Sequence, residues 1–375
     1  MTEYRQAVAS EAHEILDFAN MVFSMADAPT DFRTLYPAVY TTEHFADLHM
    51  IAKDQERIVA TLAIKPIQLM LNSEVSIFCG YLGTVATHPY QRGKGHMRHL
   101  MNRAIERSQE QGMEILALSG QRQRYNHYDF ENAAPMISYT INTDNLKGRF
   151  LDNHYSFVPV EGLDNSSLDA VYAAYQKLVL IGKRSKELFK AYLSAWKAAG
   201  FALYKNNEIK GYIYVMGKDI AEMAVEDSSG ILQVLHDWMQ FNNCDTFNVR
   251  VQSHRKDIIR ALGEVAENYS ISDSMMIHVF NWQSVLEKLL RFKSQYERLR
   301  DGEIVVEIKE EARIEISVES NRVIVQPSLK KSDAVFTHRE AVTRFFSAQG
   351  KMQEKEDQFY SWFPLMFSIP PSDCF

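Results

Sequence analysis

The residues best suited to chemistry in this sequence lie between positions 85 and 96. There Val85, Ala86 and Thr87 lead into a short basic segment, Gln91-Arg92-Gly93-Lys94-Gly95-His96. Gly93 and Gly95 lack a Cβ atom, so the backbone can turn sharply and direct its N–H groups toward an anion. The following helix would point its positive end at the same place, and the guanidinium of Arg92 suits phosphate oxygens. The spacing predicts a pyrophosphate-binding turn, with an ordinary basic helix cap as the alternative.

Two better-known phosphate motifs do not fit this segment. No Gly-x-x-x-x-Gly-Lys-Ser/Thr occurs, which excludes a P-loop, and position 98 is Arg98 where the third glycine of a dinucleotide-binding motif would stand. His96 and His99 are three residues apart, a spacing that could chelate a metal, but the glutamate of His-Glu-x-x-His is absent. We therefore expect no metal site here.

Apolar periodicity predicts the elements that must position this turn. Residues 10–26 and the residues after Gly95 have helical spacing, and Met97, Met101, Ala104 and Ser108 mark one face of the second helix. Runs typical of strands cover residues 50–52, 58–64, 75–87 and 114–118. The turn is thus expected between a long strand and a helix.

A second stretch of the sequence has the same order of predicted strands and turns, but with a different turn before the helix. Residues 201–215 again form a strand, a polar turn and a strand, and the strand Ala221–Val225 then leads into Glu226-Asp227-Ser228-Ser229-Gly230. Two carboxylates stand here where the first copy has Arg92 and Lys94, and like charges repel a pyrophosphate. We expect only the first copy to bind an anion. From residue 282 onward, helical spacing, two-residue alternation and helical spacing again predict a small α+β domain.

Composition limits the class of protein. The chain has 375 residues, of which 46% are hydrophobic and 11% aromatic, enough for two or three folded domains. Its net charge of −7 opposes a role in nucleic-acid binding. No apolar run is long enough to span a membrane and no secretory signal is present, so we expect a cytoplasmic protein. Cys79, Cys244 and Cys374 are too few and too scattered for a disulfide framework and are expected to be thiols.

The segment Gln91-Arg92-Gly93-Lys94-Gly95 after a strand resembles the Q/R-x-x-G-x-G/A signature of the GNAT superfamily of acetyl-CoA-dependent N-acetyltransferases. Three features together resemble the enhanced intracellular survival (Eis) family: a GNAT domain with this glycine turn, a second GNAT-like domain without it, and a C-terminal domain that is similar to sterol carrier proteins and ends on an aromatic residue. The resemblance implies an α/β (α+β) fold with tandem GNAT-like mixed sheets flanked by helices. It predicts domains at 1–145 and 146–284, and a C-terminal domain at 285–375 similar to sterol carrier proteins. It also implies a homo-oligomer, commonly a hexamer.

The same resemblance implies roles for particular residues. Acetyl-CoA would be the cosubstrate, with no metal, and its contacts would come from Val85, Ala86, Thr87, Arg92, Gly93, Lys94, Gly95 and His96. Backbone N–H groups of Val85 and Thr87 would stabilise the oxyanion. In the segment Arg124–Phe130, which resembles Tyr-x-x-Phe-Gly-Tyr, Tyr125 would be the acid, although Asp129 and Phe130 depart from that pattern and leave Tyr128 as an alternative. A phenol with a pKa near 10 remains protonated at neutral pH and can donate to the departing thiolate.

The base implied by the resemblance is the α-carboxylate of Phe375. Its ordinary pKa of about 3.5 is low for a base, and we expect burial beside an aromatic ring to raise it. Pro370 and Pro371 would stiffen the approach of this tail. A frayed terminus is the simpler alternative.

The resemblance also implies the acceptor: a primary amine of a cationic small molecule, aminoglycoside-like, or of lysine, acetylated in a ternary complex. Asp27 and Asp31 could attract such an amine, or could simply be solvated. A ping-pong route through Cys374 is a minor alternative. Two other classes remain open: a lipid or acyl carrier, against which the bulky Trp362, Phe363 and Phe367 argue, and a catalytically silent CoA-binding sensor.

Overall fold

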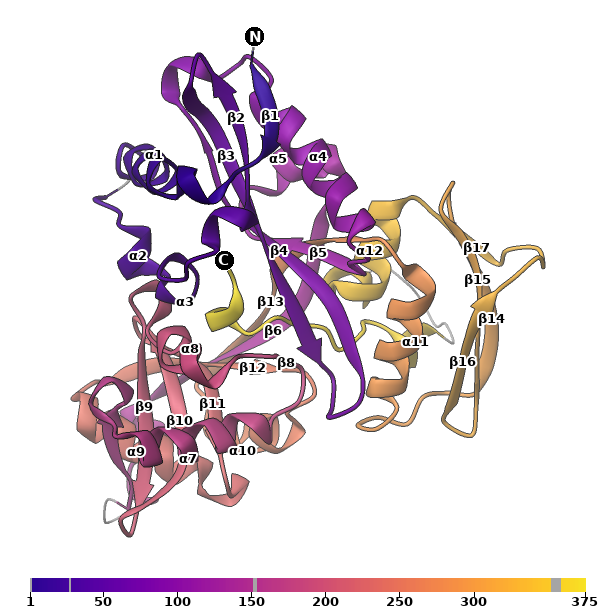
Figure 1. Ribbon diagram of the computed structural model, residues 1–375. Helices are drawn as coiled ribbons and strands as arrows, with labels where there is room; N and C mark the ends of the chain where they lie inside the picture. Colours follow the sequence, from indigo (N-terminus) through magenta and orange to yellow (C-terminus); the bar gives the residue numbers. More distant parts are fainter. Residues whose placement is uncertain (1, 27, 151–153, 352–358) are drawn as a thin grey trace. The chain divides into compact units, whose positions relative to one another are not determined.

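The computed structural model describes residues 2–26, 28–150, 154–351 and 359–375 (Figure 1). Its contacts divide the chain into two compact units. The first unit consists of Met1–Ala134, Asp273–Phe367 and Cys374–Phe375, and the second of Pro135–Ser272 and Ser368–Asp373. The chain passes between the units inside two strands, β6 (Glu131–Asn142) and β13 (Asn268–Val279), and twice more in the C-terminal tail, after Phe367 and after Asp373. The domain boundaries at residues 145 and 284 remain a prediction.

The first unit contains a mixed sheet in the order β1-β2-β3-β4-β5-β13. Its strands before β13 are β1 (Glu3–Gln6), β2 (His49–Asp54), β3 (Arg57–Met70), β4 (Ser76–Thr87) and β5 (Ile115–Leu118). Strands β4 and β5 are parallel, and α4 (His96–Glu110) connects them, because parallel neighbours need a crossover. Helices α1 (Ala12–Ser24) and α4 flank the sheet (Figure 1). The short helices of this region are α2 (Phe32–Leu35), α3 (Pro37–Tyr40) and α5 (Arg122–Tyr125).

Packing of α4 explains why its start is held firmly. Leu100, Met101 and Ala104 are fully buried in a cluster with Leu62 of β3 and Leu116 of β5. Each large aliphatic side chain contributes about 1.5–3 kcal/mol through burial. The helical face predicted from the sequence is thus the buried one, and it fixes the turn that precedes the helix.

The strands of the second unit follow one another in the order β6-β12-β11-β10-β9-β7. Besides β6, these strands are β7 (Ser156–Pro159), β9 (Ala199–Lys205), β10 (Glu208–Met216), β11 (Asp219–Val225) and β12 (Thr246–Gln252). The two-residue strand β8 (Ile181–Gly182) is not part of this order. Its helices are α6 (Thr143–Leu146), α7 (Asn165–Gln176), α8 (Lys186–Tyr192), α9 (Ile231–Asn242) and α10 (Lys256–Gly263). Strands β11 and β12 are parallel and α9 connects them, as α4 connects β4 and β5. The predicted repeat of element order is therefore present in the structure.

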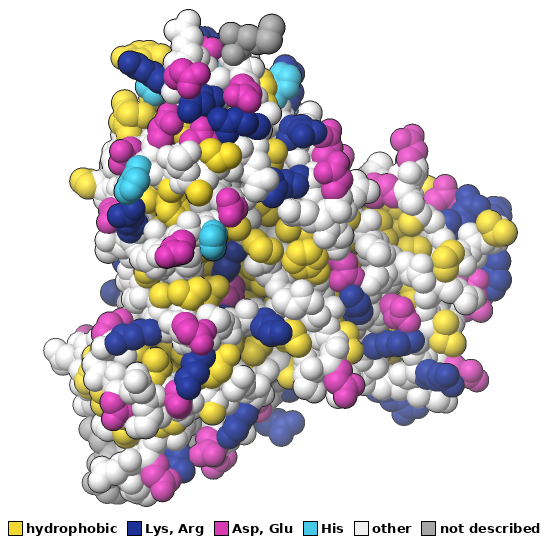
Figure 2. All heavy atoms as spheres, in the orientation of Figure 1, with side chains coloured by type: hydrophobic (Ala, Val, Ile, Leu, Met, Phe, Trp, Pro, Cys, Tyr) yellow, Lys and Arg dark blue, Asp and Glu magenta, His cyan; other side chains and the backbone are white. Residues whose placement is uncertain are grey.

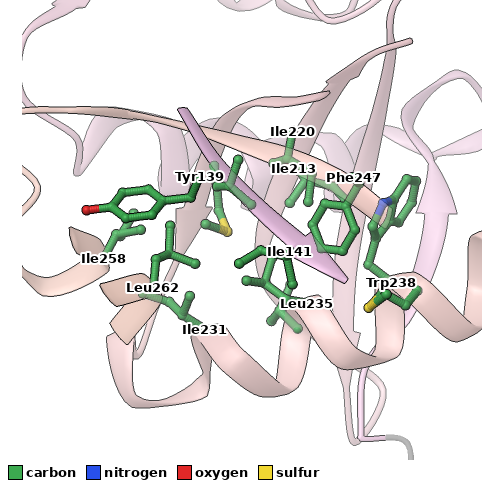
Figure 3. Packing of buried hydrophobic residues seen from close by; sticks show 14 of the residues in the cluster. Tyr139, Ile141, Ile213, Ile220, Ile231, Leu235, Trp238, Phe247, Ile258 and Leu262 are labelled. Carbon is green, nitrogen blue, oxygen red and sulfur yellow. The ribbon is translucent and has the colours of Figure 1, made fainter. Parts of the chain in front are cut away.

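The core of the second unit lies between α9 and the sheet. Ile231, Leu235 and Trp238 from α9 point toward Ile213 and Phe247 from the strands (Figure 3). At the start of this helix Gly230 has a φ of −82°, and Asp227 accepts hydrogen bonds from the N–H and hydroxyl of Ser229. The turn before α9 therefore lacks the left-handed glycines and the exposed cations Arg92 and Lys94 of the first copy.

The rest of the first unit is an α+β arrangement, as the sequence predicts. A sheet in the order β16-β15-β14-β17 is built from β14 (Gly302–Ile308), β15 (Ala312–Glu319), β16 (Arg322–Pro327) and β17 (Ala334–Phe336). The helices here are α11 (Trp282–Lys293), α12 (His338–Phe346) and α13 (Phe359–Trp362). Trp362, Phe363 and Phe367 are at most 2% exposed, so these rings are part of the core.

The sequence led us to expect neither a membrane-spanning segment nor a disulfide framework, and both points can be examined in the described residues. Within them, no helix combines the length and hydropathy required to cross a membrane. Cys79, Cys244 and Cys374 form no disulfide bond there.

Candidate active site

The glycine turn has the geometry that its sequence predicts. Gly93 and Gly95 adopt φ values of 80° and 84°, in the left-handed region that residues with a Cβ rarely occupy. Gly95 is the residue that caps α4, so the free N–H groups of the first helical turn lie directly beyond it. Arg92 and Lys94 are exposed, and the Lys94 ammonium donates to Gln91 Oε1 at 2.7 Å.

Strand β4 is irregular just before this turn. Thr84 has a φ of 48°, and the register between β3 and β4 shifts between Thr61 and Ala63. The pairs of β4 with β5 end at Leu82 opposite Leu118, whereas β4 continues to Thr87. A threonine in the left-handed region is strained, and such strain gathers at functional sites. The part of β4 beyond Leu82 therefore leaves its backbone groups available to a ligand instead of to β5.

A cavity of about 1180 Å³ opens at this place in the first unit. It is lined by the end of α1, the end of β4, the glycine turn, the first turns of α4 and residues 124–128. Val85 and Thr87 contribute to its wall, whereas Ala86 between them is 1% exposed on the opposite face of the strand. Of the residues predicted to hold acetyl-CoA, the cavity wall includes Val85, Thr87, Arg92, Gly93, Lys94, Gly95 and His96.

The charge of this cavity differs from that of the whole chain. Its basic lining residues are Arg92, Lys94, Arg98 and Arg124, and its described wall contains no aspartate or glutamate. On the face shown in Figure 2, by contrast, described Lys and Arg side chains alternate with Asp and Glu. A cluster of cations at a helix start in a protein of net charge −7 favours a polyanionic ligand.

Both candidate acids lie on the cavity wall. Tyr125 is 6% exposed and its ring packs on Gly120, where an added Cβ would lie 2.8 Å from Cε2. Burial raises the pKa of Tyr125, while Arg124 opposes part of that shift. Burial also raises the pKa of Tyr128, opposed by Arg98. Both phenols keep their proton at neutral pH, and the choice between them stays open.

The C-terminal residue packs against β4 in the first unit (Figure 1). Phe375 is 8% exposed, and its ring centroid lies 5.6 Å from that of Tyr36 and 5.8 Å from that of Tyr40. A Cβ built on Gly83 would lie 2.5 Å from a carboxyl oxygen of Phe375 and 2.6 Å from its carboxyl carbon. The carboxyl group thus rests on the Cα of Gly83, two residues before Val85.

A buried polar chain borders the same stretch of β4. The Tyr40 hydroxyl is 2.5 Å from Thr84 Oγ1 and 3.4 Å from His49 Nε2, and His49 Nδ1 is 3.0 Å from Thr61 Oγ1. Burial lowers the pKa of His49 to about 3, so its imidazole is neutral. These contacts help to hold Thr84 in its unusual conformation.

The other predicted residues have plainer surroundings. The Asp31 carboxylate caps α2, accepting from Arg33 N at 3.1 Å and from the Thr34 hydroxyl at 2.6 Å, and Asp27 lies outside the described residues. His96 Nδ1 is 2.8 Å from the Tyr4 hydroxyl, and the described part of the chain supplies no partner for its buried Nε2. No group of three potential metal-binding side chains occurs among the described residues.

Sequence reasoning missed several residues of this site. Arg98 of α4 and Arg124 of α5 extend the cationic wall, but isolated arginines on helices carry no local signal. Gly83 contacts the carboxyl group of Phe375, and Thr84 contacts the hydroxyl of Tyr40, so their importance depends on residues that are distant in the sequence. Only the unusual small-residue spacing of Gly80 and Gly83 in an apolar strand could have pointed to a close approach there.

Comparison with known proteins agrees with this geometry. Residues 3–133 match the family described as "Acetyltransferase (GNAT) domain", which makes the protein an acyltransferase and implies the use of acetyl-CoA. No curated protein matches the sequence.

Solved structures with the same fold extend over essentially the whole chain. A GCN5-related N-acetyltransferase from Anabaena variabilis is 14% identical, with a TM-score of 0.72 and full coverage of both chains. A probable N-acyltransferase from Enterococcus faecalis is 15% identical, with a TM-score of 0.72 and full coverage of both chains. Eis1 from Mycobacterium abscessus is 11% identical, with a TM-score of 0.67, and the match covers 98% of this chain and 97% of that one. These likenesses concern the fold.

Proposed function

We propose that this protein is an N-acetyltransferase that moves an acetyl group from acetyl-CoA to a primary amine in a ternary complex. The acceptor we propose is a cationic small molecule, aminoglycoside-like, with a lysine side chain as the second choice. The observation that carries the proposal is the cavity whose wall joins the glycine turn, Val85 and Thr87 at the end of β4, and Tyr125. The fold similarity to Eis1 from Mycobacterium abscessus supports it.

The basic wall would hold the anionic part of acetyl-CoA. Backbone N–H groups at Gly93 and Gly95 and the start of α4 suit a pyrophosphate, and the Arg92 guanidinium can bind phosphate oxygens in pairs. Arg98 and Arg124 supply further positive charge on the same wall. The backbone N–H of Val85, where β4 leaves β5, would polarise the thioester carbonyl.

The proposed chemistry is a direct transfer. The acceptor ammonium gives a proton to the Phe375 carboxylate, and the amine nitrogen forms a bond to the thioester carbon, with the oxyanion near the N–H of Val85. As the carbon–sulfur bond breaks, Tyr125 protonates the thiolate, with Tyr128 as the alternative acid, and the second proton lost by the attacking nitrogen restores the phenol. The products are an N-acetyl amine and CoA thiol, and one proton is released to solvent.

The proposed role of Phe375 rests on how its carboxyl group is held. Its ring lies among those of Tyr36 and Tyr40, and its carboxyl carbon lies against Gly83 on the strand that lines the cavity. A frayed end would not keep a phenylalanine at 8% exposure.

We also propose that residues 285–375 form a sterol-carrier-like domain and that the protein assembles as a hexamer. Because Trp362, Phe363 and Phe367 are core residues, a lipid-carrying role is the weaker candidate.

A thiol-release assay tests the function. Purified protein is mixed with acetyl-CoA and a panel of amines: an aminoglycoside, a polyamine and a lysine peptide. We expect CoA thiol to appear only with an amine present, and we expect a variant with three residues appended after Phe375 to lose activity by about 10²- to 10⁴-fold, the usual contribution of a positioned base. The same residues appended at the N-terminus are the control.

Binding measurements separate the alternatives. CoA affinity of the appended variant, measured by calorimetry, should match that of the unmodified protein. Tight CoA binding with no acceptor in the panel would instead identify a silent sensor. A lipid that copurifies, without any turnover, would identify a carrier.

A further inference from the structure

The second unit contains a buried ion cluster centred on Arg184. The side chain of Arg184, which lies between β8 and α8, is 0% exposed, and that of Glu222 on β11 is 4% exposed. The two form a fork: Arg184 Nη1 donates to Glu222 Oε1 at 3.1 Å and Nη2 donates to Oε2 at 2.8 Å. The Tyr212 hydroxyl donates to the same carboxylate at 2.5 Å, and the guanidinium lies 4.3 Å from the ring centroid of Tyr175. These contacts fix the arginine plane.

The remaining edge of the guanidinium holds two residues of the C-terminal tail, which belong to this unit. Arg184 Nε donates to Asp373 Oδ1 at 3.1 Å, and Nη2 donates to Oδ2 at 3.0 Å. The Ser372 hydroxyl accepts from Arg184 Nη2 at 2.5 Å and donates to Glu222 Oε2 at 2.9 Å. The cluster therefore contacts both the hydroxyl of Ser372 and the carboxylate of Asp373.

The cluster is organised to receive this tail. Without it, Arg184 and Glu222 form a neutral pair that is already oriented, so little side-chain freedom is lost when the tail binds. With it, the Asp373 carboxylate, whose side chain is 3% exposed, takes the last free edge of the arginine. Removing one partner of so deeply buried an ion pair leaves the other charge without compensation and strongly destabilises the folded state.

Gly182 forms a wall that limits the side chain at position 373. A Cβ on Gly182 would lie 2.6 Å from Asp373 Oδ2 and 2.7 Å from its Cγ, closer than real Cβ contacts. The carboxylate thus rests directly on the glycine backbone. Glutamate at position 373 would carry the same charge, but its additional methylene has no room there.

We propose that Arg184, oriented by Glu222, is a positioning residue that clamps Ser372 and Asp373 and so sets where the Phe375 carboxylate comes to lie. This inference rests on the proposed function, in which that carboxylate is the base. Two residues reach at most about 7 Å, so a fixed Asp373 confines the end of the chain to a small volume. The second GNAT-like copy, which lacks the anion-binding glycines, would thus serve the reaction by holding the tail.

Release of Phe375 by carboxypeptidase A measures the clamp without any catalysis. This protease removes C-terminal aromatic residues, and the 8% exposure of Phe375 predicts slow release from the unmodified protein. We expect at least tenfold faster release from Asp373→Asn, Asp373→Glu and Gly182→Ala, because each disturbs the contacts of the Asp373 carboxylate with Arg184 or with Gly182. Gly263→Ala is the matched control, since a Cβ there meets nothing within 4 Å. Melting temperatures identify any variant that fails to fold.

Steady-state kinetics test positioning. The clamp variants should lose kcat by tenfold or more with an unchanged KM for acetyl-CoA, whereas a general loss of structure would change both. Unchanged release and unchanged kcat in Asp373→Asn and Gly182→Ala would overturn the inference, and so would faster release with unchanged kcat. The variant extended after Phe375 separates the two proposals: if it is inactive while the clamp variants are normal, only this inference fails. If the extended variant is fully active, the base assignment fails, and the release rates still decide whether the clamp exists.

Discussion

Replacing Gly83 with alanine gives a direct test of the terminal carboxylate. The added Cβ would lie 2.5 Å from the Phe375 oxygen, and ordinary contact begins at 3.4 Å, so the two atoms must separate by 3.4 − 2.5 = 0.9 Å. Gly83 is held in β4 opposite Ala63 of β3, whereas the carboxyl group is the end of the chain. We therefore expect the carboxylate to make most of this movement.

A displacement of this size has a known order of effect. Misplacing a reacting group by about 1 Å can reduce the rate about 10²-fold, which corresponds to about 2.7 kcal/mol in the activation free energy. The KM for acetyl-CoA should stay close to that of the unmodified protein, because the cavity wall begins at Val85 and does not include Gly83. The expected signature is a loss of kcat alone.

The assay is thiol release from acetyl-CoA with a saturating amine, and the control lies on the same strand. A Cβ on Gly80 would meet Met113 Sδ at 2.7 Å and Leu116 Cδ1 at 2.8 Å, which are core atoms. Gly80→Ala should lower stability by about 1–3 kcal/mol, as overpacking does, without a selective loss of kcat. Equal kcat in Gly83→Ala and the unmodified protein, or equal losses in the two variants, would refute the reasoning.

Further predictions concern the acid, the cofactor wall and acid stability. Tyr125→Phe should lower kcat by about 10²-fold or more with little change in Tyr128→Phe, and the reverse pattern would assign the acid to Tyr128. Arg98→Ala should raise the KM for acetyl-CoA severalfold while kcat is kept, which initial-rate measurements check, and an unchanged KM would remove Arg98 from the phosphate contacts. The folded-state pKa of His49 is about 3, below its ordinary 6.5, so the unfolded chain takes up the proton first as pH falls. Its contribution is neutral above pH 6.5 and becomes destabilising between pH 6.5 and 3, by up to about 1.4 kcal/mol per pH unit. Melting temperatures of His49→Gln should therefore fall less steeply with acid than those of the unmodified protein, and parallel curves would contradict this.

The glycine turn could be predicted because its chemistry is local. Gly93 and Gly95 are needed for the positive φ angles that the turn adopts, and the apolar face of α4 fixes the helix that follows. The succession of helices and strands along the chain, and its repeat in the second unit, follow from similarly local periodicity.

The rest of the site depends on contacts between distant residues. Thr84 adopts a left-handed conformation that threonine disfavours by itself, so no local propensity announces it. Arg184 is an ordinary cation in the sequence, and its role appears only when Asp373 and Glu222 are brought to it. Such pairings depend on tertiary structure, which is why the sequence pointed to the cofactor turn and not to the clamp.

The pairing of β5 with the end of β13 has a consequence for biosynthesis. Met276–Val279 lie beside Ile115–Leu118 in the first sheet, yet the ribosome must make the whole of Pro135–Ser272 before it adds them. The nascent chain therefore has one edge of β5 uncovered while the second unit emerges, which is a typical point for chaperone binding or misassembly. Fragments ending near residue 134 should accumulate as aggregates, because they lack the strand that covers this edge.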